Sequence, residues 1–291
     1  MKRKVLTNNE FLNMLDGILP ENDRSKLIKC YPEEEQAKKK KFNVLVKNST
    51  DQINNISLQG PNSRKILEKF IFTPPTQPSI SELQWFRFTI CRVRELSGIP
   101  LMVSRTGYTG ELGYEIWCHP SDAPAVWDVL MEAGKDEGLI PAGFGALDLL
   151  RIEAGLILFG NEFDGQVDPF EAGVGFTVPL KTKTADFIGK EALIKRKENP
   201  QKKLVGLELV GKEKANHGDC VHIGRSQVGV VTSGCLSPTL NKNIALCRID
   251  VGHSEIGMNV EVGKIDGHQK RIPAKIVGFP HYDPQKTRVK S

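Results

Sequence analysis

The stretch SRTGYTGELGYEIW, residues 104–117, decides how the middle of this chain folds. Its three glycines, Gly107, Gly110 and Gly113, follow a GxxGxxG spacing and are flanked on both sides by segments with strand character. The spacing does not match the dinucleotide-binding fingerprint, which lies between a strand and a helix. The glycines alone are equally compatible with a hairpin loop that needs positive φ angles. The residues at the exit of the loop are therefore the more informative ones.

The strand that leaves the loop carries a carboxylate beside an aromatic ring. Glu115 and Trp117 project from the same face, because side chains alternate along a strand. An inward-facing carboxylate costs free energy unless donors surround it. Guanine-like and pterin-like rings present an amino group next to a ring N–H, and one carboxylate accepts both hydrogen bonds. Glu115 and Trp117 are therefore candidate residues for binding a flat heterocycle.

A second candidate is Arg151, which lies between apolar residues in LLRIEAG, on a helix that is predicted to begin after Pro141. An arginine in an amphipathic helix is ordinarily a surface residue. The functional alternative is a guanidinium reserved for a carboxylate, since its planar fork donates two parallel hydrogen bonds.

The surrounding pattern mixes strands and helices, which indicates an α+β fold. After Pro200 the chain consists of short apolar strands separated by Gly, Asn and Pro, which predicts a small β-barrel. We expect an irregular basic segment over 1–41, an α+β region over 42–200 and a β-barrel domain over 201–291. The predicted elements are two strands in 42–60, a helix from Pro61, two strands in 85–110 joined near Ser97–Gly98, a strand at 115–120, a helix over 120–139 capped by Ser121 or Asp122, the helix after Pro141, and a helix over 187–198.

Composition narrows the class of protein. The 291 residues contain 39% hydrophobic and 26% charged residues, and no apolar run approaches the ~20 residues of a membrane helix. The net charge of +5 lies largely in lysine runs without interleaved aromatics, so we expect no nucleic-acid partner. The N-terminus lacks the pattern of a secretion signal, and we expect a cytoplasmic protein in a bacterium or a mitochondrial matrix protein in a eukaryote.

The cysteines and histidines give no sign of a metal site. The six cysteines form no CxxC pair and the six histidines no HxH or HExxH pattern. His217, Cys220 and His222 lie close together in HGDCVH, but no second ligand cluster accompanies them. Free thiols and no bound metal are the expectation.

Six blocks in a fixed order resemble one known family. They are LQGPNSRKIL at 58–67, SRTGYTGELGYEIW, GFGALDLLRIEAGLILFGNEFD, DFIGKEAL, KKLVGLEL and VTSGCLSPTLNKNIAL. Over about residues 42–282 they resemble the T-protein of the glycine cleavage system. The resemblance implies an aminomethyltransferase that takes a one-carbon unit from a lipoylated H-protein, releases ammonia and forms methylene-tetrahydrofolate. It further implies that Glu115 holds the pterin, that Arg151 pairs with the glutamate tail of tetrahydrofolate and that Tyr108 lines the pterin pocket.

The N-terminal part departs from the family. Residues 1–41 show neither its "SHMG"-like block nor the strand with the aspartate that orients the folate nitrogen, and Asp16, Asp23 and Asp51 stand in other contexts. Glu162 and Asp164 are the nearest acidic candidates in sequence, so the catalytic residue stays unassigned. We expect this chain alone to bind folate better than it transfers the one-carbon unit. The alternatives are a folate-dependent demethylase with a sulfonium, methoxy or N-methyl donor, and a catalytically weak folate-binding protein.

Overall fold

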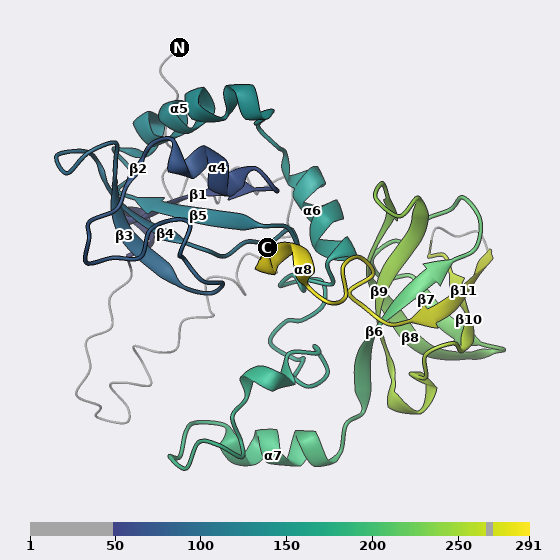
Figure 1. Ribbon diagram of the computed structural model, residues 1–291. Coiled ribbons are helices and arrows are strands. Elements are labelled where there is room, and N and C mark those ends of the chain that lie inside the picture. Colours follow the sequence, from purple (N-terminus) through teal and green to yellow (C-terminus); the bar gives the residue numbers. More distant parts are fainter. Residues whose placement is uncertain (1–48, 266–269) are drawn as a thin grey trace. The chain divides into compact units, whose positions relative to one another are not determined.

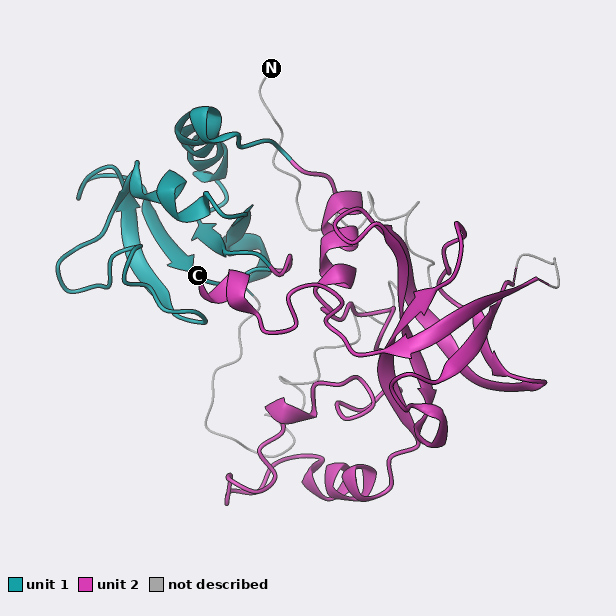
Figure 2. Ribbon diagram, turned by 45° about the vertical axis from the view of Figure 1, so that its right-hand side comes forward, with its two compact units in different colours: residues 1–107, 111–141 teal, residues 108–110, 142–291 magenta. Residues whose placement is uncertain are grey.

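The chain forms two compact units, each of which is described by itself (Figure 2). The structure is a computed structural model that describes residues 49–265 and 270–291. Among these, unit 1 comprises 49–107 and 111–141, and unit 2 comprises 108–110 and the residues from 142 onward. The strand predicted around Phe42–Val46 lies outside the described residues.

Unit 1 is an antiparallel sheet with helices on one face (Figure 1). The strand order is β1-β5-β4-β3-β2. The core lies between the sheet and the two helices, where apolar residues of both layers form one buried cluster. The elements are β1 (Asn54–Gln59), α4 (Ser63–Glu68), β2 (Ile71–Phe72), β3 (Phe88–Val93), β4 (Pro100–Ser104), β5 (Gly113–Cys118) and α5 (Ala123–Gly134), with short 3-10 turns η2 (Thr50–Gln52) and η3 (Lys135–Glu137).

The alternation in β5 assigns its two faces as the sequence predicts. Tyr114, Ile116 and Cys118 are buried in the core of unit 1. Glu115 and Trp117 lie on the opposite face and are half-buried. The prediction that these two side chains share one face is therefore confirmed.

The helix signals of unit 1 are also confirmed in position, with one difference in how a helix starts. Asp122 is the N-cap residue of α5, as one of the two expected candidates, but its side chain makes no capping hydrogen bond. A proline in the first turn favours this start instead. Proline fits there because the N–H that it lacks would have no partner within the helix.

Unit 2 contains a closed six-stranded barrel with the strand order β10-β11-β6-β9-β8-β7. All its pairs are antiparallel, and inward-facing Val, Leu, Ile and Ala residues fill the interior. The predicted barrel is confirmed. The elements are α6 (Phe144–Glu153), η4 (Gly175–Thr177), α7 (Lys190–Glu198), β6 (Lys202–Leu209), β7 (Cys220–Ile223), β8 (Ser226–Ser237), β9 (Lys242–Asp250), η5 (Val251–His253), β10 (Asn259–Gly263), β11 (Arg271–Val277) and α8 (Thr287–Lys290).

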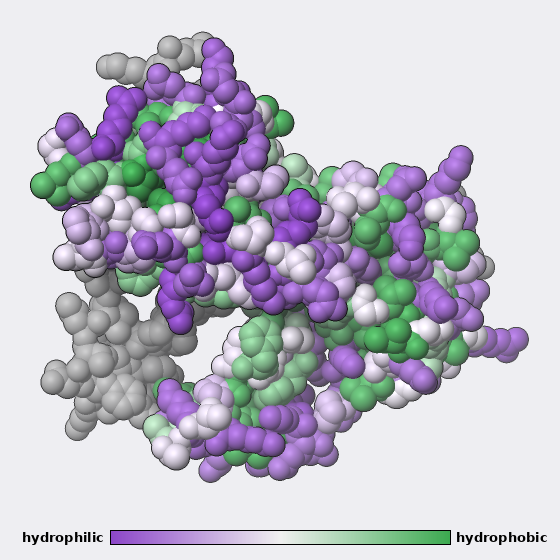
Figure 3. All heavy atoms as spheres, in the orientation of Figure 1, coloured by the Kyte–Doolittle hydropathy of each residue, from purple (hydrophilic) through white to green (hydrophobic). Residues whose placement is uncertain are grey.

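The segment between α6 and the barrel belongs to unit 2, whereas the expected domain 42–200 would group it with the sheet. The predicted boundary at residue 200 stays a prediction, and the one at residue 41 lies outside the described residues. α7 has no buried residue, and hydrophilic side chains dominate its surface (Figure 3). Within residues 49–265 and 270–291, no helix is both long and apolar enough to cross a membrane.

Candidate functional site

The face of the unit 1 sheet opposite its helices carries a row of polar side chains around Glu115. In the strand register, Glu115 lies across from Ser57 of β1 and Ser104 of β4, and Trp117 lies across from Asn55. The neighbouring strand β3 adds apolar side chains to the same face, because Phe88 and Ile90 pair with Ser104 and Met102 and both are exposed.

Two donors hold the carboxylate of Glu115. The Asn55 amide Nδ2 donates to Oε1 at 3.1 Å. The Thr106 hydroxyl donates to Oε2. Glu115 faces away from the core of unit 1 and not inward as the sequence suggested, and these two donors hold its half-buried carboxylate. A carboxylate offers about four acceptor positions, so each oxygen retains a lone pair for a further donor.

The glycine loop places Thr106 beside this carboxylate. Gln59 Nε2 lies within 3.3 Å of the Thr106 carbonyl and 3.4 Å of the Tyr114 carbonyl. A Cβ on Gly107 or Gly113 would lie only 2.0 or 1.9 Å from Gln59 Oε1, so the end of the glutamine side chain would have to move if either position carried a side chain. The glycines at these two positions therefore accommodate a side chain rather than a positive φ angle.

Gly110 has the other role of a glycine. Its φ is +77°, and within unit 2 an added Cβ would lie 2.6 Å from the Ala154 Cβ. The hairpin interpretation, with glycine supplying positive φ, therefore applies to this one residue of the three.

Tyr108 lies in unit 2, where its hydroxyl donates to the Ile157 carbonyl. Burial raises the pKa of Tyr108 to about 12, against the opposing effect of the Arg151 guanidinium. The hydroxyl is thus a neutral donor engaged by the backbone. A role for the ring in a pterin pocket stays a prediction.

Arg151 is 1% exposed and occupies a polar network inside unit 2. Its guanidinium contacts Glu162 at 2.6 Å, Asp148 at 2.8 Å, the Ser233 hydroxyl at 2.7 Å and the Leu156 carbonyl at 3.3 Å. These bonds link α6 to β8. The binding of a folate tail by Arg151 stays a prediction, and its guanidinium already has four protein partners in this structure.

The sequence did not reveal the partners in this network. Glu162 is fully buried and also accepts from the Ser233 hydroxyl at 2.6 Å and from the Leu158 N–H at 2.8 Å. A second buried carboxylate, Glu153 at the end of α6, accepts from the hydroxyls of Ser237 and Thr239. The partner hydroxyls lie more than 70 residues away in sequence, so no local pattern could predict these contacts.

The four predicted binding residues belong to different units. Glu115 and Trp117 are in unit 1, whereas Tyr108 and Arg151 are in unit 2. That the four form one site stays a prediction.

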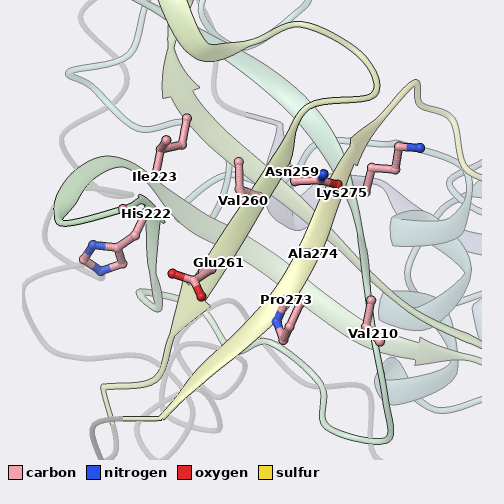
Figure 4. Close-up of a pocket in the computed structure, with 10 residues that line it drawn as sticks. Val210, His222, Ile223, Asn259, Val260, Glu261, Pro273, Ala274 and Lys275 are labelled. Atoms are coloured by element: carbon pink, nitrogen blue, oxygen red, sulfur yellow. The ribbon is translucent and has the colours of Figure 1, made fainter.

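A separate pocket of about 340 Å³ is formed by residues of the barrel (Figure 4). Strands β7, β10 and β11 line it, with His222, Glu261 and Lys275 as its ionisable residues. None of the predicted binding residues lines this pocket. Across residues 49–265 and 270–291, no three metal-ligating side chains group together, and the five cysteines in these ranges are free thiols.

Comparison with known proteins identifies the family. The family model of the GCVT N-terminal domain matches residues 7–182, and that of the glycine cleavage T-protein C-terminal barrel domain matches residues 202–283. The chain belongs to the glycine cleavage T-protein family. The match begins at residue 7, well upstream of residue 42, where the sequence blocks had placed the start of the resemblance.

Individual relatives include more than one activity. The chain is 60% identical over 257 residues to the trimethylamine-oxide aldolase of Ruegeria pomeroyi, covering 88% of this chain and 33% of the relative. It is 42% identical over 236 residues to the aminomethyltransferase of Anoxybacillus flavithermus, covering 81% of this chain and 62% of that enzyme. The chain thus spans less than two thirds of either relative.

A solved structure supports the fold. The crystal structure of glycine cleavage system aminomethyltransferase T from Bartonella henselae matches with a TM-score of 0.71 at 24% identity, over 87% of this chain and 66% of that chain. The expected combination of an α+β region with a C-terminal barrel is confirmed.

Proposed function

We propose that this chain binds tetrahydrofolate and accepts a one-carbon unit on it, with Glu115 holding the pterin ring. The observation that carries the proposal is the carboxylate of Glu115, fixed by one protein donor on each oxygen and half-buried on an open sheet face. One acceptor position remains on each oxygen, which suits an amino group and a ring N–H presented side by side.

The residues around Glu115 fit a flat heterocycle. Met102 and Trp117 are half-buried neighbours across the β4–β5 pair and supply apolar surface beside the carboxylate. A charge-assisted pair of hydrogen bonds next to such surface gives both affinity and orientation. When bound, tetrahydrofolate supplies a ring nitrogen that is nucleophilic toward a one-carbon donor. The chain's own part is to orient that ring and to exclude water from one of its faces.

The first candidate donor is an aminomethyl group on the lipoyl arm of an H-protein. In that reaction the carbon loses its bonds to sulfur and to the amino nitrogen and gains two bonds to folate nitrogens, with release of ammonia and a free thiol. Support comes from the family match and from the aminomethyltransferases at 40–44% identity. A lipoylated H-protein is the partner that this donor implies.

The second candidate donor is a small N-methyl compound. It is favoured by the 60% identity to a trimethylamine-oxide aldolase, which is well above the identity to the aminomethyltransferases. Removal of one carbon at the oxidation level of formaldehyde from trimethylamine N-oxide leaves dimethylamine, so the same folate acceptor serves either donor.

A direct assay separates these donors. The purified chain is incubated with tetrahydrofolate and either aminomethyl-lipoyl H-protein or trimethylamine N-oxide, and methylene-tetrahydrofolate, ammonia and dimethylamine are measured. Ammonia release that depends on tetrahydrofolate identifies the first donor, and dimethylamine release identifies the second. Absence of tetrahydrofolate binding in calorimetry would overturn the proposal itself.

A further inference from the structure

We infer that Trp117 positions the ligand-binding carboxylate through a one-way hydrogen-bond relay that runs from Trp117 through Ser104 and Thr106 to Glu115. The inference rests on the proposed function of Glu115. It assigns Trp117, Ser104 and Thr106 as positioning residues. The Trp117 indole N–H then has a role separate from any stacking of its ring against a ligand.

Three hydrogen bonds make up the relay. Trp117 Nε1 lies 3.1 Å from the Ser104 Oγ. The hydroxyls of Ser104 and Thr106 lie 2.8 Å apart. The Thr106 hydroxyl contacts Glu115 Oε2. All four side chains are half-buried, so these bonds are partly shielded from competing water.

The chemistry of the two ends fixes the direction of the relay. An indole N–H only donates, and a carboxylate only accepts. Ser104 therefore accepts from Trp117 and keeps its single proton for another acceptor, and Thr106 uses its proton on Glu115. The Ser104 proton has two possible acceptors, the Thr106 hydroxyl at 2.8 Å and the Glu115 carbonyl at 3.5 Å. The shorter contact has the normal length for two hydroxyls, so the proton points to Thr106.

The fold brings these residues together from two adjacent strands and one loop. Ser104 lies opposite Glu115 in the β4–β5 pair, and Trp117 lies opposite Met102. Thr106 follows the end of β4, and its carbonyl lies 3.3 Å from the amide nitrogen of Gln59. The backbone at Thr106 is therefore held in place independently of its hydroxyl.

The relay acts on one oxygen of the carboxylate, while Asn55 acts on the other at 3.1 Å. With a donor on each oxygen, the carboxylate plane cannot rotate without loss of at least one bond. Its remaining lone pairs consequently keep a fixed direction before any ligand arrives, which lowers the entropy cost of binding. Loss of the relay should therefore weaken ligands that bind both oxygens.

Affinity measurements on single variants test the positions of the relay. Thr106→Val keeps the shape of the side chain without its hydroxyl and should weaken tetrahydrofolate about tenfold, since the lost bond goes to a charged acceptor. Trp117→Phe keeps an aromatic ring without the N–H and should weaken it about threefold. Thr106→Ser restores the hydroxyl and should recover most of the affinity. Ser97→Ala is the matched control, because Ser97 lies in the turn between β3 and β4 and its hydroxyl donates to Glu95, away from Glu115.

A double-variant cycle tests the connection between the positions. In a relay, Trp117→Phe should weaken tetrahydrofolate binding little further once Thr106→Val has removed the hydroxyl that donates to Glu115. If the two substitutions instead multiply in their effects on affinity, or if Thr106→Val binds as the native chain does, the relay is wrong.

A readout in the ligand-free protein separates this inference from the proposed function. The indole N–H resonance of Trp117, identified by its loss in Trp117→Phe, should shift and exchange faster in Ser104→Ala, while those of Trp85 and Trp127 stay unchanged. Failure of the native chain to bind tetrahydrofolate would defeat the proposed function. An unchanged Trp117 resonance in Ser104→Ala would defeat the relay.

Discussion

Arg151→Ala should destabilise the barrel-containing unit strongly. The substitution removes the guanidinium that lies 2.6 Å from Glu162, and both side chains are at most 1% exposed. Loss of one partner leaves the other charge buried with only the Ser233 hydroxyl and the Leu158 N–H as donors. Broken buried pairs of this kind cost about 3–5 kcal/mol of the free energy of unfolding.

Two further variants calibrate that magnitude. Asp148→Asn removes the other ion pair of Arg151, but the Asp148 side chain is 51% exposed, so the expected loss is below about 1 kcal/mol. Arg151→Met combined with Glu162→Gln removes both charges. The amide oxygen can accept from the Leu158 N–H, and the amide NH2 can donate to the Ser233 hydroxyl, which both accepts and donates. This pair should be more stable than Arg151→Met alone, because no uncompensated charge remains.

Hydrogen exchange of peptides from α6 and β8 in increasing urea gives the free energy of unfolding of this region, and calorimetry gives ligand affinity. We expect a loss of protection in α6 and β8 for Arg151→Ala. We also expect Arg151→Ala to change the binding of tetrahydrofolate and of a pterin without the glutamate tail by the same factor. A stability loss below about 1 kcal/mol together with selective weakening of tetrahydrofolate would refute this reasoning and favour the tail-binding role.

Three other expectations can be checked on stability and reactivity. Burial lowers the pKa of His281, whose Nε2 lies 3.1 Å from the Ala245 carbonyl. The unfolded chain therefore binds the proton more readily than the folded one, and stability should fall as the pH drops below about 6.5. In a pH series of thermal melts, His281→Gln should reduce this loss of stability. Gly110→Ala places a Cβ on a residue with φ +77°, 2.6 Å from the Ala154 Cβ, so chemical denaturation should show a loss of at least about 1–2 kcal/mol in the free energy of unfolding. The control Gly252→Ala, which has open space around it and no positive φ, should lose less. Burial raises the pKa of Cys91 and Cys247 to about 12, whereas Cys220 is only half-buried. Mass spectrometry after brief alkylation of the native protein should therefore find Cys220 modified first, and equal labelling of the three thiols would contradict this expectation.

The sequence predicted those parts of the fold that local periodicity determines. The alternation around Glu115 and the strand-rich pattern after Pro200 assigned the open sheet face and the barrel correctly, since each depends on neighbours along the chain. The polar networks were not predictable in this way. Glu162 and Ser233 are 71 residues apart, and Asn55 and Glu115 are 60 apart. Such pairs depend on tertiary packing that no local pattern records.

The glycine loop shows the same limit within a shorter stretch. The hairpin alternative assigned positive φ angles to the glycines of this loop, yet only Gly110 has one, and the other two lie against the side chain of Gln59 from another strand. Likewise, Arg151 lies between apolar residues in the sequence, but its buried partners Glu162 and Ser233 lie beyond its own helix, and only the half-exposed Asp148 lies within it. The spacing of residues in the sequence identified the glycine loop and Arg151 as features of interest, but partners distant in the sequence determine which contacts these residues make.

Tetrahydrofolate binding by Glu115→Gln, measured by isothermal calorimetry, tests directly whether Glu115 holds the pterin. The substitution keeps the shape of the side chain, removes its charge and turns one acceptor into a donor, so the expected loss is about 2–3 kcal/mol, or roughly 30- to 150-fold in affinity. Glu132→Gln, an exposed carboxylate of α5 in the same unit, is the matched control and should bind as the native chain does. Native affinity in Glu115→Gln would contradict the account, because the pterin would then be held by other residues.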